Sequence, residues 1–142
     1  MMAEQRVSLI TLGSQNLAAS KQFYCEGFGW STVFENEEII FYQLNGLVLA
    51  IFANAALADD MQRATSGHYG NFALAHNVRG RDEVETLMRA LLAAGGKLLR
   101  AADEPPIGGL RGYVADPDGH AWEIAFNPGF AIDSAGNIQF GI

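Results

Sequence analysis

The chain repeats one order of predicted elements, and this repeat limits the folds that it can adopt. In the first half, we predict a strand at 6–12, a helix at 17–26, and strands at 30–34, 39–44 and 47–53. In the second half, we predict a strand at 71–78, a helix at 81–94, a strand at 97–100 and a final hairpin over 111–126. The glycines after the two helices also match, in 27–30 and 95–98. A duplication of about 60 residues predicts two half-domains that bury one common core.

Helix signals support this order. Asn16 is a candidate N-cap for the first helix, and the second helix has apolar residues at i, i+3, i+4 and i+7, beginning at Val84. Gly27 and Gly29 should end the first helix, and the Gly95-Gly96 pair should end the second. Residues 54–70 are less regular, and we interpret them as a linker that could contain a short helix.

The hairpin centred on Asn45-Gly46 predicts a sheet with two apolar faces. Strand alternation places Leu47, Leu49 and Ile51 on one face of this sheet. The other face carries Ile39, Phe41, Gln43, Val48, Ala50 and Phe52. One face should pack on the helix, and the other must be covered or must line a pocket. The predicted fold class is α+β, with two tandem βαβββ modules that form a curled mixed sheet around a cup-shaped pocket.

The second hairpin turns at Asp116-Pro117-Asp118-Gly119 and carries an acid in its last strand. If Asp116 pairs with His120, Tyr113 lies opposite Glu123 on the same face. Glu123 could lie on a solvated face, or it could serve a function, because a buried carboxylate needs a hydrogen-bond partner, a cation or a metal. The candidate cup residues are apolar and aromatic with a few polar groups, as in a small-molecule pocket, although they could also simply fill the core; they are Ser8, Phe41, Gln43, Val48, Ala50, Phe52, Asn71, Ala73, Tyr113 and Glu123.

Composition restricts the partners and the compartment. A net charge of -7 and a pI near 4.8 argue against nucleic acid or an anionic membrane as a partner, and they could favour cationic ligands. The single cysteine, Cys25, is expected to be a packed thiol, and its isolation excludes an internal disulfide framework and indicates a reducing compartment. No apolar run is long enough to span a membrane, and the N-terminus lacks the apolar core of a signal peptide. We therefore expect a cytoplasmic protein of one domain.

Several of these motifs together resemble the vicinal oxygen chelate superfamily, which groups glyoxalase I, bleomycin-resistance proteins and extradiol dioxygenases. The resemblance covers roughly residues 6–127 and is carried by residues 16–20, Phe23-Tyr24, 27–30, 116–120 and Trp122-Glu123. It implies one domain over 1–142, made of module one at 6–54, a linker at 55–69, module two at 70–127 and a C-terminal tail at 128–142. That tail could fold over the pocket or pair with a second subunit, and the resemblance implies a homodimer.

Metal-dependent members of this superfamily place ligands on the first, fourth, fifth and eighth strands. By resemblance, these positions fall on Ser8 or Leu9, on or beside Ala50, on Asn71 and on Glu123, of which only Glu123 binds metals well. Alternation points His76 and His120 away from the Glu123 face, and His68 lies in the linker. We therefore expect no metal cofactor, with a divalent ion held by Glu123 as the alternative.

Two functions follow from the resemblance. The first is a metal-free binding protein, similar in architecture to bleomycin-resistance proteins, for a small amphipathic or cationic molecule. The alternative is a metal-dependent lyase, isomerase or dioxygenase in which Glu123 is a metal ligand or a general base. Whether the protein is an enzyme is left open by the sequence.

Overall fold

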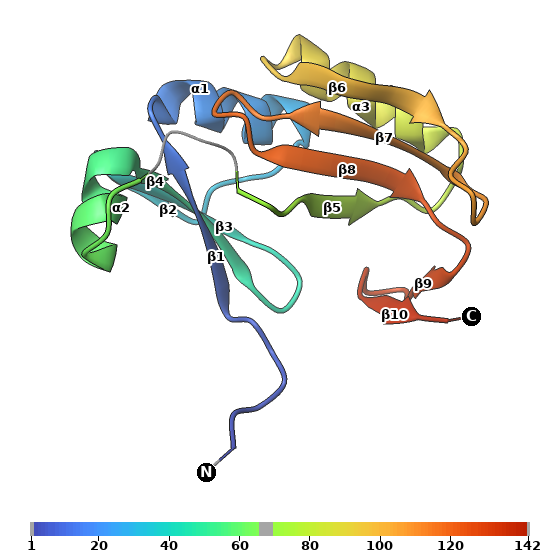
Figure 1. Cartoon of the computed structure of the whole chain (residues 1–142), viewed down its shortest axis with the longest axis horizontal. Coiled ribbons are helices and arrows are strands. Elements are labelled where there is room, and N and C mark those ends of the chain that lie inside the picture. The colour runs from blue at the N-terminus through green and yellow to red at the C-terminus, as the bar shows by residue number, and fades with distance from the viewer. Residues whose placement is uncertain (1, 66–69, 142) are drawn as a thin grey trace.

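The computed structural model describes residues 2–65 and 70–141, and it contains two similar modules joined by a helix (Figure 1). Module one comprises β1 (Leu9–Ser14), α1 (Leu17–Gln22), η1 (Phe23–Gly27), β2 (Phe34–Glu35), β3 (Ile39–Gln43) and β4 (Val48–Ala53). The linker contains α2 (Asn54–Met61). Module two comprises β5 (Leu74–Asn77), α3 (Glu83–Ala93), β6 (Lys97–Asp103), β7 (Leu110–Ala115) and β8 (Ala121–Phe126), and β9 (Phe130–Ile132) and β10 (Ile138–Phe140) follow it.

The two modules have the same sheet topology. Their strand orders are β1-β4-β3-β2 and β5-β8-β7-β6. In each, the first strand lies parallel to the last, and the other pairs are antiparallel. The predicted α+β class and the duplication of the βαβββ unit are therefore confirmed.

Several strand boundaries differ from the sequence prediction. β1 begins at Leu9 instead of residue 6, β2 covers only Phe34–Glu35 instead of residues 30–34, and β6 extends to Asp103 instead of residue 100. β5 begins at Leu74 instead of residue 71, because its one partner in the sheet is β8, whose pairing with it runs from Leu74–Trp122 to Asn77–Ala125. Apolar composition indicates a strand, but only the partner determines where pairing ends.

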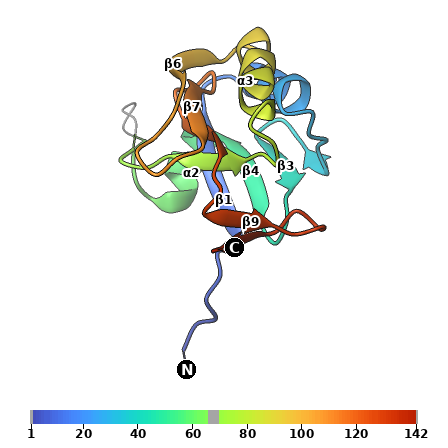
Figure 2. The ribbon, with the colours of Figure 1, turned by 90° about the vertical axis from the view of Figure 1, so that its right-hand side faces the viewer.

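α1 and α3 lie together on one side of the sheets, and α2 lies apart from them, beside β1 and β4 (Figure 2). The predicted N-cap is confirmed, because the Asn16 side chain accepts a hydrogen bond of 3.1 Å from the Ala19 amide. Gly27 has a further role where η1 meets α3: a Cβ atom there would lie 2.9 Å from a methyl carbon of Leu91. The missing side chain therefore allows the helical segments of the two modules to pack closely.

One continuous core lies between the helices and the sheets. The first sheet contributes Ile40, Tyr42, Leu49 and Ile51, and the second contributes Val114, Trp122 and Ile124. Phe23, Tyr24, Val84, Met88 and Leu91 cover them from the helical side. The alternation predicted for the first hairpin is confirmed, because Leu49 and Ile51 are buried while their neighbours on the other face are mostly only half-buried.

The face of each sheet opposite its helix is called here its open face. Register places Leu9, Thr11 and Gly13 on the first open face together with the predicted residues Phe41, Gln43, Val48, Ala50 and Phe52. The second open face carries Ala75, Arg100, Asp103, Arg111, Tyr113 and Glu123.

The C-terminal hairpin β9–β10 contacts both modules. The Asn45 side-chain amide donates to the Ala135 carbonyl at 2.8 Å, and the Arg79 guanidinium donates to the carbonyls of Ile132 and Asp133 at 3.2 and 2.7 Å. The tail is therefore tied to both halves of the same chain. No helix among the described residues is both long and apolar enough to cross a membrane.

Candidate functional site

Side chains of the turn at 116–120 form hydrogen bonds that link module two to module one. The Asp118 carboxylate accepts hydrogen bonds from the Gln15 amide at 2.8 Å and from the Ser20 hydroxyl at 3.0 Å. The His120 Nε2 lies 2.8 Å from the Gly13 carbonyl oxygen. The motif that carries part of the family resemblance therefore links the modules.

Asp116 forms the buried part of this link. The Tyr24 hydroxyl donates to its carboxylate at 2.7 Å and accepts from the Trp122 indole nitrogen at 3.1 Å. The amides of Asp118 and His120 donate to the other carboxylate oxygen. Burial raises the pKa of Asp116, although the bonds to the carboxylate oppose that shift, and burial also raises the pKa of Tyr24. Asp116 is 1% exposed, and both of its carboxylate oxygens accept hydrogen bonds from the protein. We therefore assign it a structural role.

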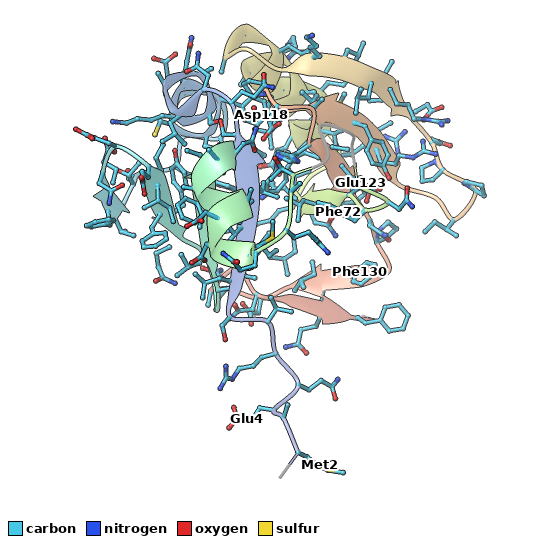
Figure 3. The ribbon with its side chains drawn as sticks, turned by 60° about the vertical axis from the view of Figure 1, so that its left-hand side comes forward. Met2, Glu4, Phe72, Asp118, Glu123 and Phe130 are labelled. Atoms are coloured by element: carbon cyan, nitrogen blue, oxygen red, sulfur yellow. The ribbon has the colours of Figure 1, made fainter. Side chains whose placement is uncertain are left out.

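Glu123 lies on the second open face, in the middle of β8 (Figure 3). It pairs directly with Tyr113, as predicted. Its carboxylate is half-buried and makes no hydrogen bond or ion pair with another described residue. Among the described residues, this leaves Glu123 free to receive a ligand.

Three further charged residues share this open face. Arg100 pairs with Tyr113 across β6 and β7, and Asp103 pairs with Arg111. The Asp103 carboxylate accepts bonds from both guanidiniums, at 3.1 and 2.8 Å from Arg100 and more closely from Arg111. The pKa of Asp103 is lowered, mainly by the hydrogen bond from Arg100 and further by the positive charges of both arginines.

A small hollow of ≈ 70 Å³ opens beside Glu123 and Arg111. Its other walls come from the loop before β7 and from the end of β8: Pro105, Ile107, Gly108, Leu110, Ala125, Phe126 and Asn127. Gly109 lets the loop approach β8, since a Cβ atom there would lie 2.2 Å from the Phe126 carbonyl oxygen. A larger hollow of ≈ 510 Å³ lies over α3, lined by Arg81, Asp82, Glu85, Arg89 and Leu110. It lacks aromatic residues and does not include Glu123, so we take the smaller hollow as the candidate site.

Three predicted site residues do not lie on the paired strands. Ser8 precedes β1, is exposed, and accepts a hydrogen bond from Arg6 at 2.9 Å. Asn71 and Ala73 are exposed and precede β5. Because both strands begin later than predicted, Ser8 and Asn71 lie before the paired residues. Leu9, the other candidate for the first-strand position, lies opposite Val48 on the first open face, and the residues opposite Ala50 and Glu123 are Thr11 and Ala75.

The pairs between the first and last strands of each module test whether a family metal would fit. On the open faces, Thr11 pairs with Ala50 in module one, and Ala75 pairs with Glu123 in module two. They offer one carboxylate, one hydroxyl and two methyl groups, which is a poor donor set for a transition metal. Within 2–65 and 70–141, no three His, Cys, Asp or Glu side chains gather to hold an ion. The donors do not fit the metal that the family implies.

Neither His76 nor Cys25 lies on the second open face. His76 pairs with Ile124 and packs against Phe28 and Trp30, with ring centroids 5.6 and 6.2 Å away. His68 lies outside the described residues. The Cys25 sulfur is 3.5 Å from the Tyr42 hydroxyl and half-buried, which agrees with a packed thiol.

Arg100, Asp103 and Arg111 were not among the site residues predicted from the sequence. Arg111 was detectable, because it precedes Tyr113 by two residues in the same strand and must share its face. Arg100 and Asp103 could not be placed on this face from the sequence, because the pairing of β6 with β7 shifts register between Leu98 and Arg100 and again between Arg100 and Asp103. Irregular pairing of this kind breaks simple alternation.

The comparisons with known proteins agree with this architecture. The sequence model of the Glyoxalase/Bleomycin resistance protein/Dioxygenase superfamily matches residues 6–124. A glyoxalase-related enzyme from Fulvimarina pelagi is 57% identical, with a TM-score of 0.95 over 98% of this chain and 100% of that one.

More distant structures share the fold. A glyoxalase/bleomycin resistance protein/dioxygenase family enzyme from Burkholderia phytofirmans is 22% identical, with a TM-score of 0.74 over 84% of this chain and 96% of that one. A lactoylglutathione lyase from Agrobacterium tumefaciens is 19% identical, with a TM-score of 0.67 over 89% of this chain and 96% of that one. No curated protein matches the sequence. On the family match and the relative from Fulvimarina, this chain belongs to the glyoxalase/bleomycin resistance protein/dioxygenase superfamily.

Proposed function

We propose that the protein binds a small molecule on its open faces without the divalent metal of the metal-dependent family members. The observation that carries this proposal is the donor chemistry of the pairs Thr11–Ala50 and Ala75–Glu123 on the open faces. Three of these four residues offer no good metal ligand, while the surface around them keeps the mixed apolar and polar character of a ligand site.

The two open faces divide the recognition between them. The first is mainly apolar through Leu9, Phe41, Val48 and Phe52. The second adds Tyr113, Glu123 and Arg111. Such a surface suits an amphipathic ligand, with the polar end toward Glu123. The arginines on this face oppose a purely cationic ligand, which the net charge of the chain had suggested.

A second candidate function is an enzyme that uses Glu123 as a general base. The observation in its favour is that the Glu123 carboxylate is half-buried, lies opposite Tyr113, and makes no hydrogen bond or ion pair with another described residue. A base must reach its substrate, and a carboxylate already engaged, as that of Asp116 is, could not do so.

Metal analysis separates these functions. Protein purified without an affinity tag should contain far less than one equivalent of metal, before and after incubation with nickel, zinc, iron or manganese and desalting. A tightly bound equivalent that Glu123→Gln abolishes would overturn the metal-free proposal and favour the metal-dependent alternative. Turnover by metal-free wild-type protein, lost in Glu123→Gln, would favour the general base.

Ligand binding is tested separately with a fragment library and protein-observed NMR. Hits should shift the amides of Ala50, Tyr113 and Glu123, and binding should survive chelator treatment. Hits confined to the larger hollow over α3 would contradict the proposed site. Phe41→Ala should weaken an open-face hit, while Arg89→Ala, which changes only the hollow over α3, should not.

We propose a homodimer as the assembly and the cytoplasm as the compartment. The large apolar side chains that remain exposed include Leu9 at 50% and Phe72 at 55%, and a second copy would remove such surface from water. The single half-buried thiol is compatible with a reducing compartment. Sedimentation velocity over a range of concentrations tests the dimer, and a monomer throughout would contradict it.

A further inference from the structure

We propose that the hollow between Arg111 and Glu123 binds the headgroup of a small zwitterion, with a carboxylate at Arg111 and an ammonium at Glu123. This rests on the proposed function and names the class of ligand.

The spacing of the two residues supports a bridging group. Tyr113 is directly opposite Glu123, and Arg111 is opposite Ala125, so Arg111 and Glu123 are diagonal neighbours on one face. Diagonal neighbours stand roughly 7–8 Å apart. They form no ion pair with each other, and both line the same hollow. A ligand with its two charges close together can therefore reach both.

Arg111 keeps donors available for a carboxylate. Its side chain is only 17% exposed, and its Nη1 donates to the carbonyl and the carboxylate of Asp103. Its Nε and Nη2 donate to no described residue. No fully buried side-chain nitrogen or oxygen among the described residues lacks a partner, so these two nitrogens face accessible space. A planar guanidinium with two free donors suits a carboxylate.

The charge balance favours a zwitterion over a single ion. On this face, Arg100 and Arg111 are matched by Asp103 and Glu123. A ligand with only a carboxylate, bound at Arg111, would be repelled by the nearby Glu123. A ligand with only an ammonium, bound at Glu123, would be repelled by Arg111. A zwitterion places its carboxylate beside Arg111 and its ammonium beside Glu123, and it leaves the net charge of the face unchanged.

The size and walls of the hollow limit the rest of the ligand. A volume of ≈ 70 Å³ takes a headgroup only, since sites for whole drug-sized ligands are typically about 300–1,000 Å³. Pro105, Leu110 and Phe126 supply apolar walls. The remainder of the ligand is therefore a small apolar group, as in an aliphatic amino acid.

The test uses three probes that share the leucine side chain: L-leucine, isopentylamine without the carboxylate, and 4-methylpentanoate without the ammonium. Each is titrated into isotopically labelled full-length protein and followed by NMR. L-Leucine should bind about tenfold or more tightly than either analogue, as expected for the loss of one charge-assisted hydrogen bond. Equal affinities, or no binding of L-leucine up to its solubility limit, would overturn the proposal.

Variants assign each charge to its residue. Arg111→Gln should remove the advantage of L-leucine over isopentylamine, and Glu123→Gln should remove its advantage over 4-methylpentanoate. The matched control is Arg100→Gln, because Arg100 bonds the same Asp103 but does not line the hollow. It should retain both preferences. If Arg111→Gln does not fold, Arg111→Lys, which keeps the charge but not the planar fork, should lower the affinity for L-leucine. An effect of Arg100→Gln equal to that of the Arg111 variant would contradict the assignment.

Failure of this inference is distinguishable from failure of the proposed function. Metal-free binding of other fragments to the open faces, with no preference for zwitterions, would overturn the headgroup assignment alone. A tight metal held by Glu123 would overturn the proposed function itself.

Discussion

The Tyr24 hydroxyl donates a hydrogen bond of 2.7 Å to Asp116, 92 positions later in the chain. One partner lies in η1 of module one and the other lies in the turn between β7 and β8 of module two. Both are buried, and Trp122 extends the network by donating to the same hydroxyl. The two halves are therefore joined by an apolar core that contains this polar network.

Replacing Tyr24 with phenylalanine should destabilise the protein by about 2–3 kcal/mol. The variant keeps the ring, but it removes a donor from the buried Asp116 carboxylate and the acceptor of the Trp122 indole. The free energy of unfolding from urea denaturation measures the effect.

Tyr42→Phe is the matched control. Tyr42 is also fully buried, but its hydroxyl bonds only a sulfur at 3.5 Å, a weak partner. Its loss should cost less than about 1 kcal/mol. Equal losses in the two variants would show that the Tyr24 network contributes no more than an ordinary buried hydroxyl.

Asp118→Ala should loosen the junction between the modules by about 1–3 kcal/mol, because it leaves the Gln15 amide and the Ser20 hydroxyl without their acceptor. Asp118→Asn should cost less, since its amide oxygen can still accept from Gln15. Amide hydrogen exchange at Gln15 should accelerate in the alanine variant. Unchanged exchange there would contradict a linking role.

The fold could be predicted from the sequence because the local signals agree with the internal repeat. Asn16, the Asn45-Gly46 turn and the 116–119 turn each act within a few residues, so their chemistry can be read directly. Glu123 and Tyr113 were placed correctly because a tight turn fixes the register of its hairpin.

The parts that were missed depend on distant partners. Ser8 and Asn71 were assigned to strands whose starts depend on β4 and β8, which lie far along the chain. Arg100 and Asp103 depend on two register shifts in β6. The contact of Asp118 with Gln15 spans 103 positions, and no periodic pattern encodes such a pairing.

His76 should make stability depend on pH. Burial lowers its pKa from the ordinary value of 6.5, and nearby Glu83 only partly opposes this shift. The unfolded chain therefore binds a proton more readily than the folded one. The stabilising contribution is present above pH 6.5 and is lost as the pH falls through the lower folded-state pKa.

The free energy of unfolding between pH 7.5 and pH 5 measures this contribution in wild-type protein and in His76→Gln. The wild type should lose more stability on acidification than the variant does, because glutamine does not titrate. Parallel pH profiles would exclude His76 as the source.

Arg79→Ala should release the C-terminal hairpin from module two with little change in global stability. The guanidinium donates to the carbonyls of Ile132 and Asp133, while β9 and β10 also pair with each other. Hydrogen exchange within β9–β10 should accelerate, whereas global unfolding should shift by no more than about 0.5 kcal/mol, as is usual for surface substitutions. Arg89→Ala, a surface arginine that bonds only Thr86, is the control and should leave the hairpin unchanged.

The Asn45→Ala variant tests the second attachment, because Asn45 holds the same hairpin from module one through the Ala135 carbonyl. If the hairpin is held by both modules together, the double variant should exchange faster than either single variant. If Arg79→Ala alone has the full effect, module two holds the hairpin by itself. If exchange is unchanged in all three variants, strand pairing within β9–β10 is sufficient, and the two attachments merely accompany it.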